Sequence, residues 1–140
     1  MSSSVLQASS KPYTCKVSSV LNRDSKTYGK KYMFDGAEDT CWNSDEGDHQ
    51  WILISFEQET SISHVNIQFQ GGFACSHCTI LSDSNGHELG TLADIYPSDT
   101  NRQQMFAVNK TTAKVFKILL EQPTDTYGRI IIYNLDFLAT

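Results

Sequence analysis

The segment QWILISF, residues 50–56, decides the fold class of this chain, because its apolar side chains recur at every second position. Ile52, Ile54 and Phe56 would lie on one face of an extended strand, with the intervening residues on the other. One buried and one solvated face is typical of antiparallel strands, so this period predicts an antiparallel sheet. The same period recurs in residues 64–70, 115–121 and 131–138.

Turn residues separate these segments and complete the prediction of an all-β fold. Asn85-Gly86 stands between residues 77–82 and 87–92 and supplies the positive φ angles of a tight hairpin turn. No window long enough for an amphipathic helix carries an apolar stripe at helical spacing. Closely spaced strands without helices are typical of a β-sandwich or jelly roll. Further turn signals lie at Gly71-Gly72, Pro97-Ser98-Asp99 and Pro123-Thr124-Asp125.

The chain has 140 residues, enough for one domain that holds itself together without disulfides or metal. Charged residues make up 19% of it and hydrophobic residues 39%, a balance that excludes an intrinsically disordered chain. No apolar run approaches the roughly 20 residues of a membrane-spanning helix. Residues 1–12 are rich in serine and lack a period, so we expect a flexible N-terminal arm followed by a β-sandwich domain at residues 13–140.

Charge and cysteine content indicate the partners and the compartment to expect. The 11 lysines and arginines against 16 acidic residues give a net charge of −5, and the largest basic cluster is Lys30-Lys31. Because nonspecific nucleic-acid binding depends on neutralising phosphates, direct nucleic-acid binding is disfavoured. The first residues lack the basic start and apolar core of a secretory signal, so we expect the chain in the nucleus and cytoplasm. There the cysteines would be free thiols: Cys15, Cys41, Cys75 and Cys78.

The acidic stretch FDGAEDTCWNS, residues 34–44, has two interpretations. Its carboxylates and its threonine hydroxyl are close enough in sequence to surround a hard cation, which prefers about six to eight oxygen ligands. Alternatively, Asp35-Gly36 forms a turn whose side chains satisfy their own backbone, and the rings of Trp42 and Trp51 pack in the core. The residues alone favour the turn and leave the cation site open.

Three segments in consecutive order resemble the discoidin or coagulation-factor type C domain of the galactose-binding jelly-roll superfamily. They are F-D-G-x-x-x-T-C-W-N-S at residues 34–44, Q-W-I-L-I-S-F at 50–56 and V-N-I-Q-F at 65–69. The resemblance covers about residues 15–139. It implies an eight-stranded antiparallel jelly roll with binding loops at one end. In secreted members these loops recognise sugars, phospholipid headgroups or collagen.

Other segments are similar to one small intracellular branch of this family, whose members are described as repressors of a nuclear receptor's DNA binding. The chain lacks the C-terminal cysteine with which secreted members form a disulfide, so we expect an intracellular role. The family also implies a structural calcium on the Asp-Gly turn, and Asp35, Asp39, Thr40 and Asp136 match the ligand positions. The branch-like segments are VSSVLNR at 17–23, YGKK at 28–31, IQFQGGF at 67–73 and YGRIIIY at 127–133.

The motif Cys75-Ser76-His77-Cys78 suggests a zinc site, but a structural zinc almost always has about four ligands. Cys41, His64 or His87 would have to converge on it from other strands. The sequence shows no phosphate-binding glycine loop, nucleophile elbow or paired histidine ligands. We therefore expect no enzyme, no catalytic residues and no required cofactor.

Exposed loop residues are the better candidates for function, because binding residues often lie on loops held by a rigid scaffold. We expect a monomeric, noncatalytic module that binds a protein partner and not a membrane, and the resemblance makes that partner a nuclear receptor. The alternative is a lectin-like module that recognises a carbohydrate or a lipid. Phe73 and Tyr127 could instead plug the end of the sandwich. The candidate partner-binding residues are Arg23, Tyr28, Lys30, Phe73, Tyr127 and Arg129.

Overall fold

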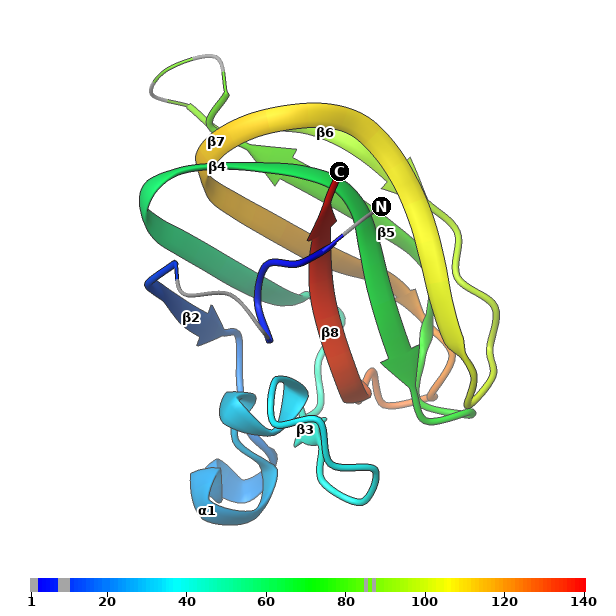
Figure 1. The fold of residues 1–140 in the computed structure, drawn as a ribbon. Coiled ribbons are helices and arrows are strands. Elements are labelled where there is room, and N and C mark those ends of the chain that lie inside the picture. The colour runs from blue at the N-terminus through cyan, green and yellow to red at the C-terminus, as the bar shows by residue number, and fades with distance from the viewer. Residues whose placement is uncertain (1–2, 8–10, 85, 87) are drawn as a thin grey trace.

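The computed structural model describes residues 3–7, 11–84, 86 and 88–140. Strands dominate it (Figure 1), and the helices of the described chain are short turns at Leu21–Arg23 (η1), Ser25–Tyr28 (α1) and Lys30–Met33 (η2). The predicted all-β class is confirmed. No helix in these residues is long and apolar enough to cross a membrane. The strands are β1 (Ser3–Ser4), β2 (Tyr13–Val17), β3 (Trp42–Asn43), β4 (Gln50–Phe69), β5 (Cys75–Ser82), β6 (Gly90–Ile95), β7 (Gln103–Pro123) and β8 (Ile131–Ala139).

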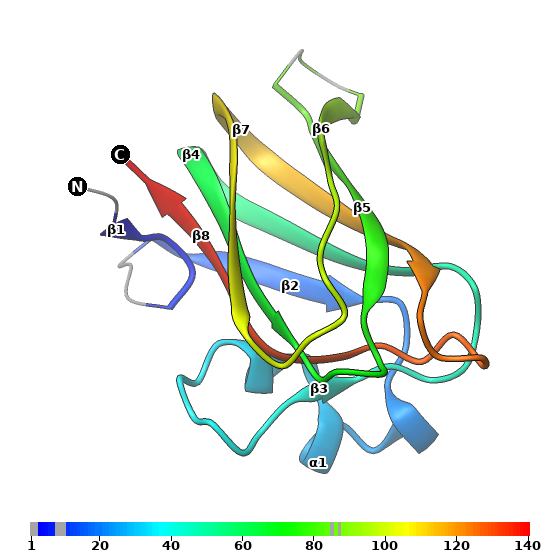
Figure 2. The ribbon, with the colours of Figure 1, turned by 90° about the vertical axis from the view of Figure 1, so that its right-hand side faces the viewer.

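The strands form one antiparallel eight-stranded sheet that folds over itself into two layers (Figures 1 and 2). Its hydrogen-bonded order is β1-β8-β4-β7-β5-β6, and β2 and β3 add to β4 and β8. The first part of β4 pairs with β2 and with residues 115–120 of β7. Its second part pairs with β8 and with residues 103–113 of β7. β4 and β7 therefore belong to both layers of the sandwich.

β4 is a single strand of 20 residues where the sequence predicted two strands, and β7, with 21 residues, extends well before its predicted segment. The register between them shifts between Ser55 and Thr60 and again between Ile62 and His64. A bulge adds unpaired residues to one strand and increases its local bend and twist. The two shifts therefore let the paired strands pass from one layer into the other without a break.

The predicted alternation places the core between the two layers. Ile52 and Ile54 of β4 are fully buried, and Phe56 is 5% exposed. The ring of Phe116 on β7 packs against those of Phe56 and Phe137, with centroid separations of 6.0 and 5.5 Å. Burying side chains of this size contributes roughly 1.5–3 kcal/mol each. The inward faces of both layers therefore hold the sandwich together.

The alternation changes phase in β8. Leu135 and Phe137 are buried, as the period predicted, but Tyr133 is partly exposed and Ile132 is fully buried. The pairing of β8 with β4 is irregular at this point. Because side chains alternate strictly only in a regular strand, the irregularity turns Ile132 inward.

Residues 3–7 differ from the expectation of a flexible N-terminal arm. Ser3–Ser4 pairs with the end of β8, and the N–H of Val5 donates to the carbonyl oxygen of Phe137 at 2.8 Å. Val5 and Leu6 are 5% and 4% exposed and belong to the hydrophobic core. Burial of these side chains offsets the entropy lost when the short segment is ordered. Residues 1–2 and 8–10 of the expected arm lie outside the described residues.

β5 and β6 form the predicted hairpin. Cys78 pairs with Ile95 in an antiparallel register that continues to the turn. Asn85 of the predicted turn lies outside the described residues. Gly86 has a φ of 119° and donates its N–H to the carbonyl oxygen of Asp83. A residue with a side chain would be strained at this angle, which explains the use of glycine.

Candidate functional site

The loops that carry the candidate residues gather at one end of the sandwich. Figures 1 and 2 show α1, β3, the β4–β5 connection and the β7–β8 connection at this end, while the β5–β6 turn lies at the other. The two connections are tied together. The N–H of Thr124 donates to the carbonyl oxygen of Ala74 at 2.9 Å, and the N–H of Ala74 donates to the Thr124 hydroxyl at 3.0 Å. The scaffold therefore holds Phe73 beside the loop that carries Tyr127 and Arg129.

Phe73, Tyr127 and Arg129, with Asp125, form what we call the loop cluster. The guanidinium carbon of Arg129 lies 5.1 Å from the ring centroid of Phe73 and 6.0 Å from that of Tyr127. The Nε of Arg129 donates to Oδ2 of Asp125 at 3.2 Å. Cation–π contacts and a charged hydrogen bond hold the guanidinium in a defined position. The structure thus brings together three of the predicted partner-binding residues.

Asp125 orients the cationic side of the loop cluster. Its Oδ2 accepts a hydrogen bond from the backbone N–H of Arg129 at 3.0 Å as well as from Nε. Burial by itself raises the pKa of this carboxyl, but the hydrogen bonds and charge of Arg129 outweigh burial and lower the pKa below its ordinary value. Asp125 is therefore ionised at neutral pH and keeps the guanidinium in place.

Tyr127 is the exposed part of the loop cluster. It is 61% exposed and so does not plug the end of the sandwich, whereas Phe73 is partly buried. The next residue, Gly128, has a φ of 81°, and a Cβ there would collide with the carbonyl oxygen of Gly47. Gly47 also donates its N–H to the carbonyl oxygen of Tyr127 at 3.0 Å. This close packing of two loops presents the Tyr127 ring to solvent.

The other three predicted partner-binding residues lie on the segment of helical turns. Arg23 and Lys30 are exposed, and Tyr28 is partly buried at the end of α1. The side chain of Asp24 begins α1 by accepting a hydrogen bond from the N–H of Thr27 at 3.2 Å. Among the described residues, no hydrogen bond, ion pair or ring contact joins these three to the loop cluster. The six residues share one end of the fold but do not form one contacting cluster.

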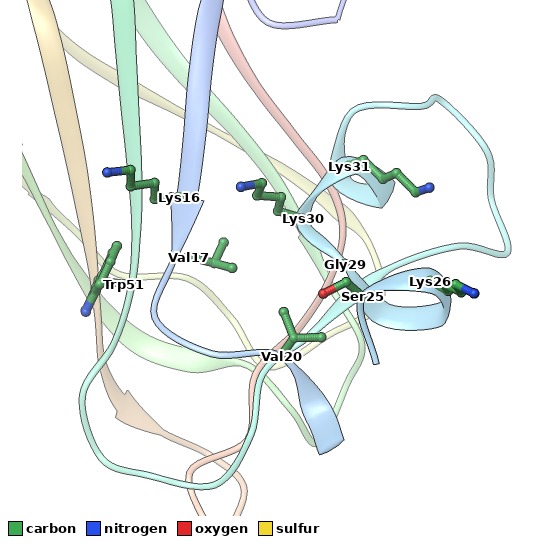
Figure 3. A pocket seen from close by; sticks show the side chains of 9 residues that line it. All are labelled: Lys16, Val17, Val20, Ser25, Lys26, Gly29, Lys30, Lys31 and Trp51. Carbon is green, nitrogen blue, oxygen red and sulfur yellow. The ribbon is translucent and has the colours of Figure 1, made fainter. Parts of the chain in front are cut away.

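A groove of about 520 Å³ between β2, β4 and the helical turns was not predicted (Figure 3). We call it the lysine groove. Trp51 forms one wall, because it lies on β4 between the inward-facing Gln50 and Ile52 and so faces outward. The alternation in residues 50–56 already indicated that Trp51 faces outward. The groove itself was not predicted, because its lysines come from separate segments of the chain. The lining residues are Lys16, Val17, Val20, Ser25, Lys26, Gly29, Lys30, Lys31 and Trp51.

Among the described residues, the three carboxylates of the predicted calcium site do not form one group. Asp35 accepts hydrogen bonds from the N–H of Ala37 at 3.0 Å and from the Thr40 hydroxyl at 2.6 Å. Asp136 lies in β8, where its Oδ1 accepts a hydrogen bond from the N–H of Leu6 at 3.0 Å. Across the described parts of the chain, no three His, Cys, Asp or Glu residues form a group that could hold a metal ion. Asp35 and Thr40, with the exposed Asp39, thus match the alternative interpretation, a turn that satisfies its own backbone.

The Cys75–Cys78 motif is a buried thiol pair. Both cysteines are fully buried with Sγ atoms 3.2 Å apart, and all four cysteines of the chain are free. The hydrogen bond with Cys75 and burial raise the pKa of Cys78 well above its ordinary value. His77 instead contacts the carboxylate of Asp94 at 2.8 Å. His87, the other histidine considered near this motif, lies outside the described residues.

The antiparallel two-layered sandwich has the jelly-roll fold of galactose-binding-like domains. Residues 8–134 match the F5/8 type C domain family, and the chain belongs to that family. The resemblance found in the sequence is confirmed.

Two similar curated proteins are both named nuclear receptor 2C2-associated protein. The Xenopus laevis protein is 48% identical over 124 residues, which cover 89% of this chain and 91% of that protein. The Homo sapiens protein is 41% identical over 124 residues, 89% of each. Among solved structures, CpGH89CBM32-5 from Clostridium perfringens, in complex with GalNAc-β-1,3-galactose, has a TM-score of 0.80 at 15% identity and covers 98% of this chain and 100% of its own. That likeness shows the fold alone.

Proposed function

We propose that this chain is a noncatalytic protein-binding module that regulates a nuclear receptor. The observation that carries the proposal is the loop cluster, in which Asp125 and two aromatic rings hold Arg129 while Tyr127 remains 61% exposed. Tyrosine and arginine are enriched among residues that dominate binding energy at protein interfaces. The relatives named nuclear receptor 2C2-associated protein support a nuclear receptor as the partner.

The module would act by binding the receptor protein and hindering its approach to DNA. With a net charge of −5, the chain is a poor competitor for the DNA itself, because duplex affinity comes largely from phosphate neutralisation. It would act as a monomer in the nucleus and cytoplasm and needs no cofactor. The contact surface would be the loop end with Arg23, Tyr28, Lys30, Phe73, Tyr127 and Arg129.

Direct binding to the purified nuclear receptor named in the relatives, nuclear receptor 2C2, tests the proposal. Tyr127→Ala and Phe73→Ala should each weaken the complex by more than about 1 kcal/mol, roughly a fivefold loss of affinity, if these rings are anchors. Leu89→Ala is the control, because Leu89 is 39% exposed on the turn at the other end. A gel shift with the receptor's DNA element should show that the module lowers receptor binding. If the module shifts the DNA alone, or if the loop variants bind the receptor as well as the wild type, the proposal fails.

A carbohydrate ligand is the second candidate function. An exposed tyrosine beside an arginine and an aspartate on one loop face is also the arrangement expected of a sugar site, and Tyr127, Arg129 and Asp125 provide it. Binding of the chain to a glycan array, lost in Tyr127→Ala and kept in Leu89→Ala, would favour it over receptor binding.

A further inference from the structure

The lysine groove collects positive charge in an otherwise acidic chain. Four of the 11 lysines and arginines line it, at Lys16, Lys26, Lys30 and Lys31. No aspartate or glutamate of the described chain is among the lining residues. The Nζ of Lys117 adds a fifth cation, 4.9 Å from the ring centroid of Trp51. The groove is therefore a local site of positive potential, although the whole chain carries a net charge of −5.

The four lining lysines differ in the direction in which their side chains extend. In Figure 3, Lys16 and Lys30 extend toward the side on which Trp51 lies, whereas Lys26 and Lys31 extend away from it. The Nζ of Lys31 instead lies 5.0 Å from the ring centroid of Tyr32. Lys16 comes from β2 and Lys30 from η2, and both line the groove.

The charge of Lys30 affects the pKa of Cys15, a residue of β2. Burial raises the pKa of the Cys15 thiol to about 12, and the charge of Lys30 acts against this shift. Lys30 therefore lies close enough to β2 for its field to reach the residue before Lys16.

The rest of the lining is apolar or small. Val17 and Val20 contribute methyl groups, and Trp51 contributes a partly exposed ring. In Figure 3 the hydroxyl of Ser25 points toward Val20. Aromatic and aliphatic lining with a few fixed polar groups is typical of ligand pockets of about 300–1,000 Å³. The complementary ligand combines carboxylates with an apolar side chain.

We propose that the lysine groove binds an acidic peptide segment, with carboxylates on Lys16 and Lys30 and an apolar side chain against Trp51 and Val20. This second site shares Lys30 with the proposed receptor surface and does not depend on the receptor being the partner. β2 pairs with β4, and no other described strand pairs with it. Nucleic acid fits less well, because it requires a basic track longer than one groove.

Titration of tryptophan fluorescence with a defined peptide tests this proposal. The peptide has about eight residues, with glutamates on both sides of a central Phe-Leu pair, and its partner has glutamine for every glutamate. The chain has two tryptophans and Trp42 is fully buried, so a change in emission reports Trp51. We expect the glutamate peptide to change the emission with saturation, and the glutamine peptide to bind at least about tenfold more weakly.

Charge-reversal variants identify the groove. The double variant Lys16→Glu, Lys30→Glu should weaken glutamate-peptide binding by about tenfold or more. The matched control Lys110→Glu, Lys114→Glu makes the same change in net charge at exposed positions of β7. It should bind within about twofold of the wild type at roughly 0.15 M salt, where distant charges are screened. If charge reversal unfolds the chain, Lys16→Gln, Lys30→Gln serves in its place, with far-ultraviolet circular dichroism as the folding check.

Several results would overturn the acidic-peptide site. They are equal binding of the glutamine peptide, equal losses in the two charge variants, and no saturable binding of the glutamate peptide. Tighter binding of a single-stranded oligonucleotide or of phosphatidylserine vesicles, lost in the groove variant, would assign the groove to another class of partner. Tyr127→Ala should leave peptide binding unchanged, so failure of the groove and failure of the receptor proposal are separate results.

Discussion

Trp42 and Trp51 lie on either side of one loop, yet they have opposite environments. Trp42, on β3, is fully buried, pairs in the sheet with Ile132 and donates its Nε1–H to the carbonyl oxygen of Ser19 at 2.9 Å. Trp51, on β4, faces outward, lies next to the Nζ of Lys117 and forms a wall of the lysine groove. The sequence predicted both rings in or beside the core: Trp42 lies in the core, and Trp51 is partly exposed with its ring directed outward.

The two tryptophans show that the role of an aromatic ring depends more on the face of the strand than on the hydrophobicity of the residue. Both tryptophans have the same side chain, but β4 turns Trp51 away from Ile52, whose side chain is fully buried. An inward ring stabilises the fold through packing. An outward ring next to cations is available for binding. Variants on the two faces should therefore separate stability from binding.

Replacing Trp42 should have the largest effect. Trp42→Ala removes a fully buried ring and leaves a cavity, so we expect a loss of roughly 3–5 kcal/mol in the free energy of unfolding. Trp51→Ala should lose about 1 kcal/mol, because its ring is partly in water already. Urea denaturation followed by circular dichroism measures both. Equal losses of unfolding free energy in the two variants would contradict the inward position of Trp42 and the outward position of Trp51.

The N-terminal segment gives the next largest effect. Leu6 is 4% exposed, so Leu6→Ala should lower the free energy of unfolding by about 2–3 kcal/mol. Met105→Ala is the control, since Met105 is an apolar side chain that is 56% exposed, and it should change stability by about 0.5 kcal/mol or less. If the Leu6→Ala protein is as stable as the wild type, the result would favour the flexible N-terminal arm that the sequence predicted.

A smaller effect should appear at alkaline pH. Cys15 pairs with the inward-facing Ile54, and burial raises its pKa to about 12, so the folded thiol stays neutral where the unfolded thiol ionises. The stability contribution is full below the ordinary thiol pKa of about 8.5 and is lost as pH rises toward the folded value. Between pH 8 and pH 10 we expect a decline of about 1–2 kcal/mol in the free energy of unfolding.

Cys15→Ala supplies the control for this pH dependence. Its unfolding curves at the two pH values should lie closer together than those of the wild type, because the titrating thiol is gone. Cys41→Ala should flatten the dependence less, because burial also raises the pKa of Cys41 but its thiol is less buried than that of Cys15. An unchanged slope in Cys15→Ala would contradict the burial of Cys15.

The smallest effect belongs to the loop cluster. The pKa of Asp125 is lowered, so its contribution is present above the ordinary carboxyl pKa of about 3.9 and is lost as pH falls through the lower folded value. Asp125→Asn should lose about 1 kcal/mol or less at neutral pH, and its stability should converge with that of the wild type in acid. Asp48→Asn, at an exposed loop position, should match the wild type throughout. A persistent difference between Asp125→Asn and the wild type below pH 3 would argue against the ion pair with Arg129.

The candidate site was predicted in part. Phe73, Tyr127 and Arg129 were selected as loop residues, and they meet because the β4–β5 and β7–β8 connections end at the same side of the sandwich. Among the described residues, the carboxylates proposed as calcium ligands do not form one group, and Asp136 instead accepts a hydrogen bond from the N–H of Leu6. No local sequence pattern predicts this hydrogen bond, because Leu6 and Asp136 lie near opposite ends of the chain. The lysine groove was missed for the same reason.

The antiparallel strands, the family and the acidic net charge were predictable from the residues alone, because they follow from a two-residue period, from local motifs and from composition. The burial of Leu6 against the core and the meeting of Lys16 and Lys30 in one groove could be seen only in the folded chain. These outcomes depend on register shifts in β4 and on contacts between distant segments. The free energy of such contacts is a property of the packed chain and cannot be assigned to any short stretch of it.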